Sequence, residues 1–187
     1  MITIVSGLPR SGTSLMMQML VAGGMTPLAD GERVADADNP KGYLEWERIK
    51  TLPKDPGCIA EAEDKVVKVI SKLLLALPAG HEYRIVFMQR PLPEVLASQD
   101  QMLKRRGAYK EGADAAIISA AFEKHLREVY GWMEGKSYVK TLRIPYHDVL
   151  EKPREIVQQL AQFLQIDFDI KAMTQQIDES LYRNRGK

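Results

Sequence analysis

Short apolar runs alternate with amphipathic segments along most of the chain. Runs rich in β-branched and aromatic residues predict strands at residues 2–6, 65–70, 83–89 and 138–144. Apolar residues at helical spacing predict helices at residues 12–22, from 93 onward, and at 114–134, 153–164 and 169–177, with shorter helical segments at 43–51 and 71–77. This alternation predicts a three-layer α/β/α fold with a mostly parallel central sheet.

Two stretches interrupt the pattern. Residues 25–41 and 53–57 are rich in Gly, Pro, Asp and Asn and are expected to form loops. Asp114 is the expected N-cap of the long helix at residues 114–134. The apolar flank of that helix would carry Ile117, Ala121, Leu126, Val129 and Trp132. The length of 187 residues predicts a single domain, 1–187.

Composition adds little about partners. The 26 basic and 25 acidic residues nearly cancel, so net charge predicts no nucleic-acid partner, although a local basic patch stays open. A single cysteine, Cys58, excludes an intrachain disulfide and fits a reducing, cytoplasmic setting. The chain has no long apolar run and no signal-peptide pattern at its start, so no membrane segment is expected.

The strongest chemical signal is the turn after the first predicted strand, Gly7-Leu-Pro-Arg-Ser-Gly-Thr-Ser14. A strand, a Gly-x4-Gly loop and a helix N-terminus together form a cradle for phosphate-like anions. In a nucleoside-triphosphate P-loop the residue after the second glycine is a lysine that reaches the outer phosphates. Here that position is Thr13, and the basic residue is Arg10. The loop is therefore suited to an anion but lacks the lysine typical of kinases.

A second candidate anion site follows the third strand. Arg90 leaves that strand, and Ser98 lies in the second turn of the next predicted helix. In parallel sheets the carboxyl ends of the strands meet at one edge, so this pair and the Gly7–Ser14 loop should line the same edge. Two such sites suit a ligand with phosphates at two ends.

With these motifs the chain resembles the sulfotransferases that use 3′-phosphoadenosine 5′-phosphosulfate (PAPS). The family's 5′-phosphosulfate loop is similar to Pro9-Arg-Ser-Gly-Thr-Ser14, and its 3′-phosphate motif, an Arg and a downstream Ser after a strand, is similar to Arg90 and Ser98. A third stretch, from Ile144 to Pro153 with Phe163-Leu164, resembles a more structural family segment. The pattern is nearest to bacterial and carbohydrate-type members and spans about residues 2–166.

The resemblance implies a P-loop architecture like that of nucleotide kinases, a PAPS cofactor, no required metal and in-line sulfonyl transfer. Residues expected at the cofactor are Pro9, Arg10, Ser11, Gly12, Thr13, Ser14, Arg90, Ser98 and, by a faint match in the C-terminal tail, Arg185. Arg10 and Lys68 would assist the leaving group, although Lys68 could instead extend to the surface.

The acceptor hydroxyl or amine needs a general base. The histidine that small-molecule cytosolic members carry has no counterpart in residues 67–72, so a glutamate is expected. Glu45, after the turn Asn39-Pro-Lys-Gly42, is preferred over Glu32, and the pKa of this base should be raised by partial burial. The sequence does not identify the acceptor, which is expected to be a small molecule, a carbohydrate or a lipid. A kinase-like phosphotransferase and a non-catalytic nucleotide-binding module remain alternatives.

Overall fold

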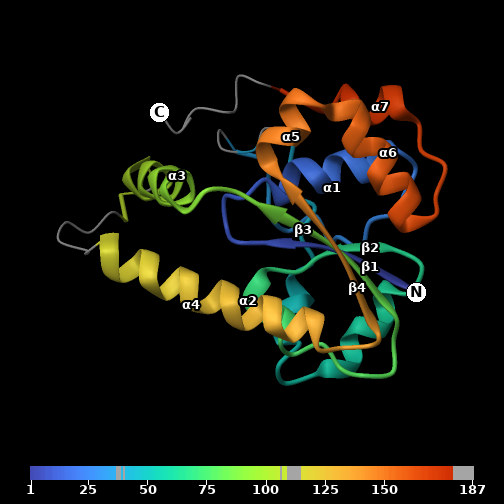
Figure 1. Ribbon diagram of the computed structural model, residues 1–187, viewed down its shortest axis with the longest axis horizontal. Helices are drawn as coiled ribbons and strands as arrows, with labels where there is room; N and C mark the ends of the chain where they lie inside the picture. Colours follow the sequence, from blue (N-terminus) through green and yellow to red (C-terminus); the bar gives the residue numbers. More distant parts are fainter. Residues whose placement is uncertain (37–38, 40, 106, 109–114, 179–187) are drawn as a thin grey trace.

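A four-stranded parallel sheet forms the centre of the computed structural model, which describes residues 1–36, 39, 41–105, 107–108 and 115–178. The strands are β1 (Ile2–Gly7), β2 (Val66–Lys68), β3 (Tyr83–Gln89) and β4 (Val139–Pro145), in the order β2-β1-β3-β4 (Figure 1). The parallel sheet expected from the sequence is confirmed.

Helices cover both faces of the sheet (Figure 1). One face carries α1 (Thr13–Ala22), α5 (Tyr146–Glu151), α6 (Pro153–Leu164) and α7 (Ile170–Thr174). The other carries the 3₁₀ helices η1 (Glu47–Thr51) and η2 (Pro56–Ala62) together with α2 (Ser71–Leu74) and α4 (Ala115–Glu134). Helix α3 (Leu92–Arg105) follows the carboxyl end of β3 and contacts α4. This is the predicted three-layer arrangement.

The core consists of two apolar clusters, one on each side of the sheet. Ile4 and Phe87 belong to the cluster under α2, α4, η1 and η2, whereas Val5 and Met88 belong to the cluster under α1, α5, α6 and α7. Successive strand residues point to opposite faces of the sheet. Because an apolar cluster covers each face, every residue of β1 is buried. A strand covered on both faces reads as a continuous apolar run, which is why the sequence identified β1 so clearly.

Three expectations were wrong in detail. The predicted break at residues 53–57 gives way to η2 from Pro56, and the helix Tyr146–Glu151 was missed because it is short and lies between Pro145 and Pro153. Ile117, placed on the buried flank of the long helix, is exposed because the first half of α4 contributes no residue to either buried cluster. The expected N-cap Asp114 lies outside the described residues.

The topology decides what gathers at the carboxyl edge. Because β1 lies between β2 and β3, the loop after β1 is flanked by the end of β2 on one side and the end of β3 on the other. Val5 is in register with Lys68, and Gly7 with Met88, so both neighbouring strands end near the start of the loop. In the part of the chain described, no helix is both long and apolar enough to cross a bilayer.

Candidate active site

A cavity of about 520 Å³ opens at this edge of the sheet. Its volume falls in the range of small-molecule binding sites. Although the whole chain is almost neutral, two acidic residues and six basic ones line the cavity, the basic ones being Arg10, Arg33, Lys50, Lys68, Arg90 and Arg105. This concentration of positive charge in a concave site favours an anionic ligand.

The loop between β1 and α1 has the backbone of an anion cradle. Gly12 adopts φ 99°, and a Cβ at this position would collide with the Tyr146 ring. Arg10 also adopts a left-handed φ, 70°, which is uncommon for a non-glycine residue and occurs often at functional sites. Helix α1 begins without a side-chain cap hydrogen bond, which leaves its first-turn N–H groups oriented for an anion.

The two motifs that the sequence placed at one edge are in direct contact. Arg10 Nε donates a hydrogen bond to Ser98 Oγ at 3.0 Å. Arg90 Nη1 donates to the backbone carbonyl of Arg10 at 3.1 Å. The side chains of Arg10, Arg90 and Ser98 all line the cavity. The loop after β1 and the start of α3 therefore form one continuous basic surface.

Arg90 is held in place by buried partners. Its Nε pairs with Glu94 Oε2 at 3.0 Å, and the guanidinium lies 5.0 Å from the centre of the Tyr146 ring. The other oxygen of Glu94 is 3.1 Å from His147 Nε2. Glu94 is almost fully buried, so the carboxylate fixes the arginine geometry rather than facing solvent. Sequence reasoning did not identify Glu94 or His147, which lie far apart in the chain.

Lys68 places a cation beside the loop, which itself has no lysine at Thr13. Its side chain is only 7% exposed and comes from the end of β2. Its Nζ lies 2.9 Å from Ser14 Oγ and 2.9 Å from Glu45 Oε1. The lysine is thus directed into the site, between the loop and a carboxylate, and does not extend to the surface.

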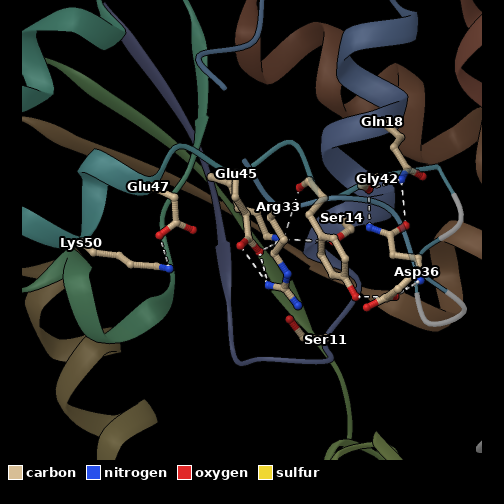
Figure 2. A network of polar contacts seen from close by, with 12 residues as sticks. Ser11, Ser14, Gln18, Arg33, Asp36, Gly42, Glu45, Glu47 and Lys50 are labelled. Carbon is tan, nitrogen blue, oxygen red and sulfur yellow. Dashed lines mark hydrogen bonds and ion pairs between the residues drawn. The ribbon is translucent and has the colours of Figure 1, made fainter. Parts of the chain in front are cut away.

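Glu45 lies between two cations, Lys68 and Arg33, and Figure 2 shows its contact with Arg33. Besides Lys68, Arg33 Nη1 donates to both carboxylate oxygens of Glu45 at 2.9 Å. Burial by itself raises the pKa of Glu45, but the Lys68 and Arg33 charges and hydrogen bonds outweigh it, so the pKa is lowered. The expectation of a raised glutamate pKa was therefore wrong for this arrangement. Burial in turn lowers the pKa of Lys68, an effect that Glu45 opposes.

The turn before Glu45 is fixed by side chains of its own. Gln18 of α1 donates to Asn39 Oδ1 at 3.0 Å and to the Gly42 carbonyl at 2.9 Å (Figure 2). The Tyr43 hydroxyl donates to Asp36 at 2.7 Å, and Arg33 lies over the Tyr43 ring. These contacts fix the turn that precedes Glu45, whose carboxylate meets the same Lys68 ammonium that contacts Ser14.

The predicted site residues separate into four groups. Residues that line the cavity are Pro9, Arg10, Gly12, Thr13, Ser14, Glu45, Lys68, Arg90 and Ser98. Ser11 is buried beneath the loop, where its hydroxyl donates to the Leu8 carbonyl at 2.7 Å, so its side chain stabilises the turn. Glu32 is exposed and does not line the cavity. Arg185 lies outside the described residues.

Arg33 and Gln99 are among the cavity residues that the sequence did not single out. Arg33 is hidden in a loop without periodicity, and only its neighbour Glu32 drew attention in the sequence. Gln99 follows Ser98 on α3 and lines the cavity, and its Oε1 is buried with no hydrogen-bond partner among the described residues. A buried acceptor of this kind favours a ligand that donates a hydrogen bond. Within the described ranges, no group of three or more His, Cys, Asp or Glu side chains is placed to hold a metal ion.

No family model matches the sequence, and no curated protein matches it. Several solved structures, however, resemble the structure of this chain. The sulfotransferase domain from the curacin biosynthetic pathway aligns with a TM-score of 0.56 at 16% identity, over 95% of this chain and 77% of its own. The sulfotransferase domain of the Synechococcus PCC 7002 olefin synthase aligns with a TM-score of 0.62 at 13% sequence identity, over 100% of this chain and 80% of its own.

A mouse sulfotransferase in complex with PAP aligns with a TM-score of 0.58 at 16% identity, over 99% of this chain and 66% of its own. Identities this low establish the arrangement of elements and leave chemistry to be argued from the residues. The parallel sheet, its flanking helices and the loop after β1 therefore give this chain the fold of the sulfotransferases.

Proposed function

We propose that this protein transfers a sulfonyl group from PAPS to a hydroxyl or amine of an acceptor. The observation that carries the proposal is the contact between the two anion motifs, Arg10 Nε to Ser98 Oγ, beside the Lys68–Glu45 pair. A ligand with phosphate groups at two ends matches two joined basic positions. The Glu45 carboxylate, which pairs with Lys68 at this position, matches a reaction that removes one proton.

The residues present fit the PAPS molecule. The Gly12 cradle has no room for a Cβ, so the backbone N–H groups of the loop approach an anion closely. These groups, with Arg10 and Ser14, would hold the 5′-phosphosulfate, and Arg90 with Ser98 would hold the 3′-phosphate. Gln99 follows Ser98 in the chain, and its Oε1, which has no partner among the described residues, offers an acceptor for an amino group on the same ligand.

The reaction needs a base and a stabilised leaving group. When bound, PAPS supplies the sulfonyl group: the acceptor oxygen or nitrogen bonds to sulfur, the bond from sulfur to the 5′-phosphate oxygen breaks, and PAP leaves with that electron pair. Glu45 is ionised at neutral pH because its pKa is lowered, and its carboxylate takes the acceptor proton. Lys68 and Arg10 stabilise negative charge that develops on the leaving oxygen.

Lys68 links binding of an anion at the loop to the basicity of Glu45. Its ammonium touches both Ser14 of the loop and Glu45. When Lys68 turns toward an anion held by the loop, its hold on Glu45 weakens, and the pKa of the carboxyl rises toward the range of an effective base. The low pKa without ligand is consistent with this role.

Calorimetry with adenosine 3′,5′-bisphosphate (PAP), ADP and ATP, with and without Mg²⁺, tests the proposal. We expect Mg²⁺-independent PAP binding that weakens about tenfold to 100-fold in Arg90→Ala, because a hydrogen bond to a charged group contributes about 1.5–3 kcal/mol. Arg84→Ala is the matched control, since Arg84 lies on β3, the strand that Arg90 directly follows, but bonds to Phe163 and Gln165. Ser98→Ala provides a second variant that leaves the Arg90–Glu94 pair intact.

Other outcomes are distinguishable. Mg²⁺-dependent ATP binding without PAP binding would instead favour a phosphoryl-transfer enzyme. PAP binding with no sulfonyl transfer to any acceptor would favour a nucleotide-binding module. In an active enzyme, Glu45→Gln should lose turnover by about 10²- to 10⁴-fold while PAP affinity stays within a few-fold.

A further inference from the structure

One side of the cavity is apolar. It is formed by Trp46 and Ile49 of the η1 region, Ile70 and Leu73 at α2, and Met102 of α3, here called the apolar wall. The wall begins next to the reacting groups, because Trp46 follows Glu45 in the chain and Ile70 lies just beyond Lys68. Trp46 and Ile49 belong to one apolar cluster, against which Leu73 packs, so these three wall residues form one apolar surface.

Ile70 is unusually exposed for a large apolar side chain, at 45%. Among the residues that the structure describes, the exposed large apolar residues are Val34, Ile70, Ile117 and Ile170, and of these Ile70 alone lines the cavity. Apolar surface left in water is unfavourable, and burying it under a ligand recovers that free energy. The position of Ile70 therefore favours an apolar ligand at the mouth of the site.

Several of the polar side chains that line the cavity are already used within the protein. Gln18 and Asn39 bond to each other and to Gly42. Lys50 pairs with Glu47, and Arg33 pairs with Glu45 (Figure 2). The indole N–H of Trp46 is the one conventional hydrogen-bonding group that the wall side chains carry. A sugar, whose many hydroxyls lose their water on binding, would find few partners here.

We propose that the acceptor is an alcohol or phenol whose hydroxyl sits on an apolar body. The hydroxyl lies at Glu45 and the apolar body lies along the wall from Trp46 to Ile70. This inference rests on the proposed function, since it assigns the substrate class of the same site.

The test uses PAP-saturated protein and a series of straight-chain primary alcohols from butanol to octanol, with glucose for comparison. Binding is read from the fluorescence of Trp46 in a Trp132→Phe background, because Trp132, the other tryptophan, does not line the cavity. Sulfonyl transfer from PAPS is measured in parallel. Each added methylene that reaches the wall should raise both affinity and kcat/KM about fourfold, which is the transfer free energy of about 0.8 kcal/mol per buried CH₂.

Ile70→Ser should weaken octanol binding about tenfold and leave PAP affinity unchanged. Ile170→Ser is the matched control. Ile170 is similarly exposed, at 41%, and also lies at the start of a helix, but it does not line the cavity. That variant should bind octanol and PAP as the parent protein does.

The results separate the two proposals. Absence of PAP binding refutes the proposed function. If PAP binds but octanol binds no more tightly than butanol, or glucose is the better acceptor, the substrate class is refuted while the cofactor assignment stands. Equal loss of octanol binding in the Ile70 and Ile170 variants also overturns the inference.

Discussion

Glu45→Gln should destabilise the protein because it leaves Lys68 buried without its carboxylate partner. Removing one member of a fully buried ion pair costs about 3–5 kcal/mol. Here the Glu45 side chain is 18% exposed, and Lys68 keeps its contact with Ser14, so a smaller loss of about 1–3 kcal/mol is expected. For a chain of this length, each kcal/mol lowers Tm by about 2–4 °C.

Urea unfolding followed by circular dichroism measures this loss. Glu47→Gln is the matched control, because Glu47 pairs with the exposed Lys50 and its removal should change stability by less than about 0.5 kcal/mol. The double variant Glu45→Gln/Lys68→Met should recover at least half of the lost stability, since neither charge then remains buried. A Glu45→Gln protein as stable as its parent, or two substitutions whose effects simply add, would refute the coupling.

The stability contributed by Glu45 also depends on pH. Its pKa is lower in the folded than in the unfolded protein, so its contribution is complete above the unfolded-state value and is lost as pH falls through the folded value. The stability gap between parent and Glu45→Gln should be widest near neutral pH and should close in acid. A gap that widens on acidification would contradict the lowered pKa.

Two further predictions concern the loop and the base. Gly12→Ala should abolish PAP binding by pushing the loop away from Tyr146, as measured by calorimetry. Gly24→Ala, which has a similar φ of 109° but open space around it, should lose some stability and keep PAP binding, and equal affinity in both variants would contradict the steric argument. Arg33→Gln removes one of the two cations that lower the pKa of Glu45, so the acid limb of the kcat/KM profile for sulfonyl transfer should move to higher pH. An unmoved limb would mean that Glu45 is not the group that titrates.

Much of the candidate site was predictable because it is local in sequence. A strand, a glycine-rich turn and a helix start are contiguous in residues 2–22, and Arg90 and Ser98 lie on one strand–helix junction. Parallel topology then required both junctions to lie at one edge, which the structure bears out. The short helix Tyr146–Glu151 was not predictable in the same way, because it is stabilised by packing of Tyr146 and Val149 into the core.

The sequence by itself determined the strand–helix alternation, the candidate anion-binding loop and the lack of a lysine in that loop, because these depend on periodicity and on adjacent residues. Only the tertiary structure decided that Lys68, from a different strand, lies beside this loop, and that Arg33 and Lys68 together lower the pKa of Glu45. The pKa of a carboxyl depends on charges within a few ångströms in space, which come from residues far apart in the chain. For that reason the identity of the candidate base was readable from the sequence, and the sign of its pKa shift was not.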